Sequence, residues 1–137
     1  MKCYAVIDTN VLVSSLLTKN LDSATVSVIK LIVDGSVTPV FSDEILQEYN
    51  DVLHRKKFHF RHENIQKLLD IFSYFGLKIT PHTADYELPD PKDVPFYEVT
   101  MEIKENHGYL VTGNKKHFPG KPYIVDAREF VDIVKSL

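Results

Sequence analysis

Short apolar runs alternate along this chain with segments in which apolar residues recur at helical spacing. The runs at residues 3–7, 37–41, 109–112 and 123–125 are brief and β-rich, as in strands buried inside a parallel sheet. The longer amphipathic segments between them are typical of helices packed on such a sheet. This alternation predicts an α/β fold, a three-layer α/β/α sandwich with a mostly parallel central sheet.

Start and stop signals set the boundaries of the predicted helices. Thr9 or Asn10 is expected to cap the first helix, and Gly35 follows the second, where a left-handed stop is expected. Asp126 and Glu129 give the last helix a start that resembles a capping box. The expected helices cover residues 11–17, 23–34, 43–53, 65–75 and 96–103, and a last one begins at 127, whereas the proline-rich stretch 81–95 is expected to be a surface connection.

Length and composition narrow the class of protein. A chain of 137 residues with 44% hydrophobic and 26% charged residues suits one folded domain over residues 1–137. No apolar run approaches the roughly 20 residues that span a bilayer, so we expect no membrane association. Cys3 is the only cysteine, which excludes an internal disulfide and a cysteine-rich zinc module. Together with the absence of a signal peptide, this predicts a cytoplasmic protein.

The charge is unevenly distributed. With 16 Lys and Arg against 19 Asp and Glu, the net charge of −3 excludes a general polycation that grips nucleic acid by bulk charge. Residues 54–62 nevertheless form one basic stretch, and Lys115, Lys116 and His117 form another. Such runs are usually solvated faces. The first stretch faces either a substrate or a protein partner.

Three acidic residues are candidates for chemistry. Asp8 directly follows the first strand, and ligands of open α/β sheets bind beyond the carboxyl ends of strands. Glu48 lies at the border of the apolar stripe of its helix, and Asp93 precedes the helix that begins near residue 96. Each also has a purely structural interpretation. Asp8 and Asp93 could be helix N-caps, Glu48 could be solvated, and Asp90 could belong to an Asp-Pro turn.

The turn Thr112-Gly113-Asn114 follows a later predicted strand. If the strands are parallel, their carboxyl ends share one edge, where Asp8, Glu48, Asp93 and Asn114 could converge. Clustered carboxylates repel one another, and a divalent cation relieves that repulsion. Oxygen ligands suit Mg²⁺ or Mn²⁺, which activate water and stabilise charge on a phosphoryl oxygen. The pattern therefore predicts phosphodiester hydrolysis.

Four segments carry a family resemblance, and they cover essentially the whole chain in the family's order. Residues 6–14 (VIDTNVLVS), 42–49 (SDEILQEY), 90–96 (DPKDVPF) and 110–114 (LVTGN) resemble the acidic segments of PIN domains, the metal-dependent nuclease fold of many prokaryotic toxins. The resemblance implies a PIN-like sandwich and an endonuclease for single-stranded RNA. It also implies the toxin of a type II toxin–antitoxin pair, with a cognate antitoxin as partner and self-association through residues 11–17 and 23–34.

The site residues are carried over by position. Asp8, Glu48 and Asp93 would hold one or two Mg²⁺ or Mn²⁺ ions, and Asn114 would add an amide oxygen. The supporting residues implied by the resemblance are Thr9 and Asn10 for the first acid, Asp90 in the third acidic segment, and Thr112 with Asn114 at the far wall. Granting the nuclease fold, Lys115, Lys116 and His117 lie beside the site and are predicted to bind the RNA backbone.

This sequence also departs from the family pattern. Asn114 stands where many relatives have Asp, and Lys92 and Val94 occupy positions that are often acidic. Fewer carboxylates favour an alternative function, a degenerate PIN-like module that binds RNA or protein without cutting. A phospho-receiver domain is a second alternative, with Asp8 and Thr112 in its acid and hydroxyl positions. Such a domain also needs an acid after its central strand and a Lys-Pro after its last strand, and this chain has neither in those places.

Overall fold

Five strands form the central sheet of the protein, whose computed structural model describes residues 2–137. Every neighbouring pair is parallel, in the order β3-β2-β1-β4-β5. The prediction of a mostly parallel sheet is therefore confirmed. The strands are β1 (Cys3–Ile7), β2 (Val37–Phe41), β3 (Leu77–Lys78), β4 (Gly108–Val111) and β5 (Ile124–Val125).

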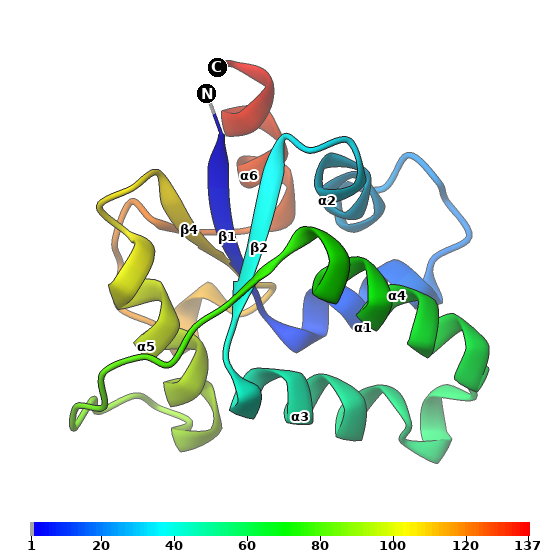
Figure 1. The fold of residues 1–137 in the computed structure, drawn as a ribbon, viewed down its shortest axis with the longest axis horizontal. Coiled ribbons are helices and arrows are strands. Elements are labelled where there is room, and N and C mark those ends of the chain that lie inside the picture. Colours follow the sequence, from blue (N-terminus) through cyan, green and yellow to red (C-terminus); the bar gives the residue numbers. More distant parts are fainter. Residues whose placement is uncertain (1) are drawn as a thin grey trace.

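Helices cover both faces of the sheet and its carboxyl-end edge. Helix α5 lies against β1, β2 and β4 on one face, whereas α2, α4 and α6 pack on the other, and α3 lies below the strand ends (Figure 1). The three predicted layers are thus present. The helices are α1 (Thr9–Leu17), α2 (Ala24–Val33), α3 (Asp43–Leu53), α4 (His62–Phe75), α5 (Val94–Ile103) and α6 (Ala127–Lys135), with short 3₁₀ turns η1 (Lys56–Phe58), η2 (Pro91–Asp93) and η3 (Lys115–His117).

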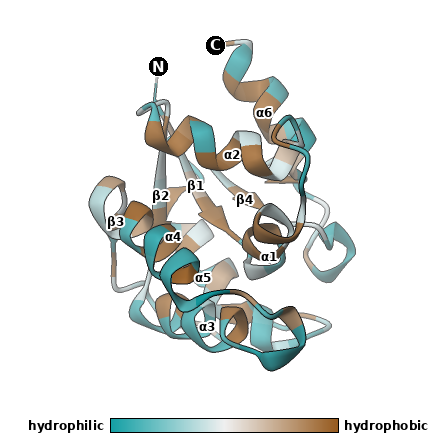
Figure 2. Cartoon of the chain, turned by 90° about the vertical axis from the view of Figure 1, so that its right-hand side faces the viewer, coloured by the Kyte–Doolittle hydropathy of each residue, from teal (hydrophilic) through white to brown (hydrophobic). Residues whose placement is uncertain are grey.

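The hydrophobic core runs through the middle of the sheet. Ala5, Val6 and Ile7 are fully buried because β1 is the central strand and is covered on both faces. The side view in Figure 2 shows hydrophobic strands behind a largely hydrophobic α2 and a more hydrophilic α3 at the strand ends. No helix within residues 2–137 has the length and apolar character needed to cross a membrane.

Most predicted helix ends are confirmed, but three helices begin two or three residues earlier than expected, at Thr9, His62 and Val94. Ser42 accepts a hydrogen bond from the backbone of Ile45, Asp126 forms the full capping box, and Gly35 has the left-handed φ of 87°. The first helix, however, begins at Thr9 rather than at Val11. Its N-cap position is occupied by Asp8, because β1 ends directly before it and leaves no linking turn.

One buried tyrosine connects α3 to the central strand. Tyr49 donates a hydrogen bond of 2.5 Å from its hydroxyl to the backbone carbonyl of Ile7. Its ring meets Phe72 of α4 edge-on, with 5.4 Å between ring centroids. Tyr49 adjoins Glu48 in sequence, and Ile7 adjoins Asp8, so this contact brings the first two candidate acids to the same place.

Candidate active site at the carboxyl end of the sheet

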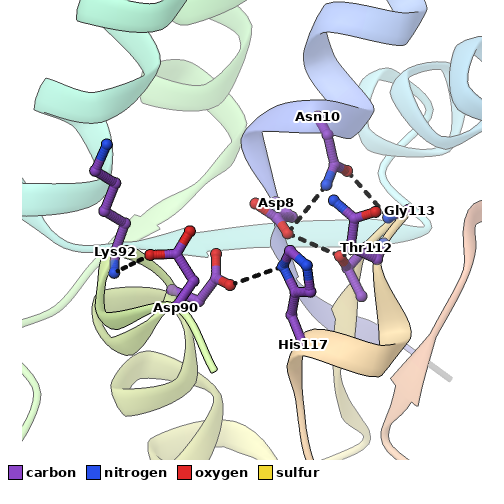
Figure 3. A network of polar contacts seen from close by, with 9 residues as sticks. Asp8, Asn10, Asp90, Lys92, Thr112, Gly113 and His117 are labelled. Atoms are coloured by element: carbon purple, nitrogen blue, oxygen red, sulfur yellow. Dashed lines mark hydrogen bonds and ion pairs between the residues drawn. The ribbon is translucent and has the colours of Figure 1, made fainter. Parts of the chain in front are cut away.

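Asp8 occupies the N-cap position of α1 but does not cap the helix. No backbone amide of the helix bonds to its side chain as a cap. Its Oδ2 instead accepts hydrogen bonds from Thr112 Oγ1 at 2.7 Å and from Asn10 Nδ2 at 3.3 Å (Figure 3). The residue is only 6% exposed. Its carboxylate is therefore held in place by side chains from the first turn of α1 and from the turn after β4.

A second set of contacts ties these two turns together. Asn10 Oδ1 accepts a hydrogen bond of 3.0 Å from the backbone amide of Gly113, and Thr112 Oγ1 accepts one of 3.0 Å from the amide of Asn114. A Cβ at Gly113 would lie only 3.3 Å from Asn10 Oδ1, so a larger residue would crowd this contact. Asn10 thus contacts the first acid, as the resemblance implied, and Thr112, which was expected only at the far wall, holds the same carboxylate.

Glu48 reaches the site from α3. The Thr9 hydroxyl donates a hydrogen bond of 2.6 Å to Glu48 Oε2. Thr9 was expected to support the first acid; its side chain bonds to the second acid, whereas its backbone makes a hydrogen bond to Asp8. The reason is that α1 packs against α3, so the side chain of its first helical residue meets α3 rather than Asp8.

Asp93 comes from the other side of the site. It stands at the N-cap position of α5, yet its side chain makes no capping bond, and its Oδ2 lies 3.2 Å from His117 Nδ1. Figure 3 shows His117 between Asp8 and the segment that carries Asp90. Asp90 itself accepts a hydrogen bond of 3.0 Å from the Lys92 amide, which matches the turn role considered for it.

The three carboxylates share one electrostatic environment. Burial, followed by the charge of Asp93, raises the pKa of Asp8 to about 6, although the hydrogen bond from Thr112 and the charge of His117 oppose the rise. The pKa of Glu48 is raised mainly by burial and then by Asp8. The pKa of Asp93 is raised by burial, by Asp90 and by Glu48. Each acid therefore feels at least one of the others.

Carboxylate oxygens are the ligand type that hard divalent cations prefer. Buried carboxylates that repel one another gain stability when such an ion neutralises them. The side-chain hydrogen bonds engage one oxygen of each acid, namely Oδ2 of Asp8, Oε2 of Glu48 and Oδ2 of Asp93. Within residues 2–137, no three His, Cys, Asp or Glu side chains form a ready-made metal site. The acids are neighbours rather than a closed coordination shell.

The remaining predicted residues lie around this centre. Asn114 is exposed, and its side chain makes no hydrogen bond within the described chain. Lys115 Nζ lies 2.7 Å from Glu129 Oε1, so its charge is paired with α6. Lys116 is exposed, and His117 contacts Asp93. The RNA-binding assignments of these residues stay predictions.

Two residues contribute more than the sequence indicated. Tyr49 was expected only as part of an apolar stripe, but its hydroxyl joins α3 to the end of β1. Glu98 on α5 was not singled out, although it is just 7% exposed, and burial raises its pKa. Glu98 stands at a position with no acidic motif around it, so only the fold reveals its burial.

Comparison with known proteins adds one finding. The family model described as PIN domain matches residues 4–116. This range includes all three acids and the turn after β4. No curated protein and no solved structure matches the chain.

Proposed function

Because this chain belongs to the PIN-domain family, whose fold is of the nuclease type, we propose that it is a metal-dependent endoribonuclease that hydrolyses phosphodiester bonds in single-stranded RNA. The observation that carries the proposal is the convergence of Asp8, Glu48 and Asp93. Two of them stand at helix N-cap positions without capping, which leaves their charge for another purpose.

Asp8, Glu48 and Asp93 would hold Mg²⁺ or Mn²⁺, with the amide oxygen of Asn114 as a neutral addition. Such an ion, when bound, promotes ionisation of water and stabilises negative charge on the phosphoryl group. The chain's own residues keep the acids oriented. Thr112 and Asn10 hold Asp8, and Thr9 holds Glu48, as outer hydrogen-bond partners commonly do for metal-binding carboxylates.

His117 and Lys116 complete the proposed substrate wall. His117 lies next to Asp93 at the start of the segment after β4, where a phosphate beside the acids would meet a hydrogen-bond donor. Lys116 adds a positive charge to the same exposed turn. Lys115 would bind RNA only by exchanging its partner Glu129 for a phosphate.

We also propose a biological setting, that of a cytoplasmic toxin restrained by a cognate antitoxin that covers the acidic site. A homodimer through α1 and α2 belongs to the same proposal. Leu17, Leu21 and Val33, at the ends of these helices and in the loop between them, are large apolar side chains that are 56%, 69% and 49% exposed, and exposed apolar side chains favour a protein partner. Light scattering of the purified protein measures the dimer directly, and a monomer at all concentrations would contradict it.

The test of the activity is cleavage of a mixed single-stranded RNA by purified protein. We expect cutting with Mn²⁺ or Mg²⁺ and none with EDTA. An identically purified Asp8→Asn variant controls for contaminating nucleases. If folded, metal-loaded and antitoxin-free protein does not cut, the nuclease proposal is wrong, and the binding-module alternative, which the uncharged Asn114 favours, takes its place.

Removing the Thr9 hydroxyl is expected to weaken metal binding. Thr9→Val keeps the shape of the side chain but leaves Glu48 Oε2 without its 2.6 Å partner. We expect Mn²⁺ affinity to fall about 10- to 100-fold, the usual effect of losing an outer partner of a metal ligand. Calorimetric titration with Mn²⁺ measures this.

Thr9→Ser is the matched control because it retains the hydroxyl and should bind Mn²⁺ nearly as the natural chain does. Equal affinities for the Val and Ser variants would show that Glu48 needs no positioning by Thr9.

A further inference from the structure

The connection between α3 and α4 is the most basic part of the chain. Residues 54–62, called here the basic tip, contain four Lys or Arg and three His residues and no acid, in a protein whose net charge is −3. Its four strong cations are exposed, and none of them forms an ion pair within the described residues. They are Arg55, Lys56, Lys57 and Arg61.

The basic tip has a fixed shape. Phe58 and Phe60 stack with 5.3 Å between ring centroids and 10° between planes. Lys57 Nζ lies 5.1 Å from the centre of the Phe58 ring, which fixes that cation. His54 Nε2 and His62 Nδ1 lie 2.9 Å apart and join the ends of the two helices. Because these contacts exist before any ligand arrives, the basic tip loses less conformational entropy when a ligand binds.

The aromatic rings of the basic tip pack against other side chains of the protein and are not available for stacking on a nucleobase. One face of Phe58 meets Phe60, and Lys57 lies over its ring. Phe60 packs against the hydrophobic core. The groups that remain available are ammonium and guanidinium groups. Their chemistry suits phosphates, which carry no sequence information.

A groove runs between Arg55, at one end of the basic tip, and Glu48 of the acidic site. It has a volume of about 520 Å³ and is lined by Glu48, Arg55 and Lys92, among others. Arg55 lies two residues beyond the end of α3, and Glu48 lies on α3 five residues before that end.

The groove also contains acidic groups, which limit where a phosphate can lie. Glu44 and Asp51 line it, and Gln47 Nε2 donates a hydrogen bond of 2.8 Å to Asp51 Oδ1. A phosphate is therefore favoured at Arg55 and Lys92 rather than along the whole wall.

We propose that the basic tip, which includes Arg55, binds the phosphate backbone of an RNA strand that reaches the acidic site along α3. The inference rests on the proposed function for the identity of the ligand. Continuity between the tip, the groove and Glu48 favours RNA over an acidic protein segment, because a protein would need no path to the carboxylates. Binding through phosphates is independent of base sequence.

The experiment measures RNA binding without cleavage. Asp8→Asn protein is titrated into a fluorescently labelled single-stranded RNA of mixed sequence, and anisotropy is followed at several salt concentrations. Adding Lys56→Ala and Lys57→Ala is expected to weaken binding about tenfold and to reduce the salt slope by about one to two, as expected for two lost phosphate contacts.

Two matched variants make the result specific. Lys2→Ala with Lys135→Ala removes the same charge near the termini, which lie at the opposite end of the molecule from α3 (Figure 1), and should leave RNA affinity unchanged. Lys56→Arg with Lys57→Arg keeps the charge and should restore binding. Far-ultraviolet circular dichroism checks that every variant is folded.

The outcomes separate this inference from the proposed function. Unchanged RNA affinity in the alanine variant overturns the inference even if the natural protein cuts RNA. Tip-dependent RNA binding by a protein that cuts nothing supports the inference and overturns the nuclease. If the tip binds a polyglutamate peptide but makes no contribution to RNA affinity, the surface serves an acidic protein and the inference is wrong.

Discussion

Asp8→Asn is expected to reduce metal-dependent RNA cleavage by at least about 100-fold without unfolding the protein. The substitution removes a negative charge at the centre of the acid cluster, where an ion worth several kcal/mol of transition-state stabilisation would be held. Asparagine has nearly the same shape and can still accept the hydrogen bond from Thr112 Oγ1, now 2.7 Å from Asp8 Oδ2. The loss should therefore be chemical rather than structural.

Glu48→Gln and Asp93→Asn should have comparable effects, measured as initial rates of cleavage in Mn²⁺. Asp132→Asn is the matched control, since Asp132 is an exposed acid on α6, away from the other three. Activity within threefold of the natural chain in Asp8→Asn, after its purity has been verified, would place the reaction elsewhere on the molecule.

The same Asp8→Asn substitution should raise the free energy of unfolding near pH 8. Burial raises the pKa of Asp8 from an ordinary value of 3.8 to about 6, so the folded state disfavours the ionised carboxylate. A carboxyl group whose pKa is raised in the folded state contributes fully to the free energy of unfolding below pH 4. This contribution is lost as the pH rises through 6. The shift of about two units corresponds to about 3 kcal/mol.

We expect the variant to recover about 1–3 kcal/mol at pH 8, because the new amide also has to find a hydrogen-bond acceptor. Urea unfolding between pH 4.5 and 8 in EDTA measures it, and the advantage of the variant should shrink toward the acid end. Glu48 and Asp93 shift in the same direction but are present in both proteins. A variant that is less stable than the natural chain throughout this range would contradict the prediction.

Local patterns in the sequence were sufficient to predict the architecture of the fold. The apolar runs at 3–7 and 37–41 became β1 and β2 with the predicted bounds, because burial on both faces demands continuous apolar residues there. Capping chemistry placed the starts of α3 and α6 correctly. Asp8 was considered as an N-cap and does stand at that position of α1, but its side chain bonds to Thr112 rather than capping the helix.

The hydrogen bonds between the side chains of the site could not be predicted from such local patterns. The bond between Thr9 and Glu48 depends on how α1 packs against α3, and the contact between His117 and Asp93 depends on two loops meeting across the sheet. Periodicity describes one element at a time and contains no information about such pairs. The chain order of the motifs predicted which residues would gather, but not which would touch.

The contact between Asp8 and Thr112 has a consequence for the synthesis of this protein. The two residues are 104 positions apart, and His117 comes later still. A nascent chain that has not yet released β4 from the ribosome has Asp8 and Glu48 but neither Thr112 nor His117 to orient the acids. Such long-range pairing also closes late in folding, because the loop entropy is lost before the contact is gained. The acidic centre can thus be assembled only after β4 and the turn that follows it have left the ribosome.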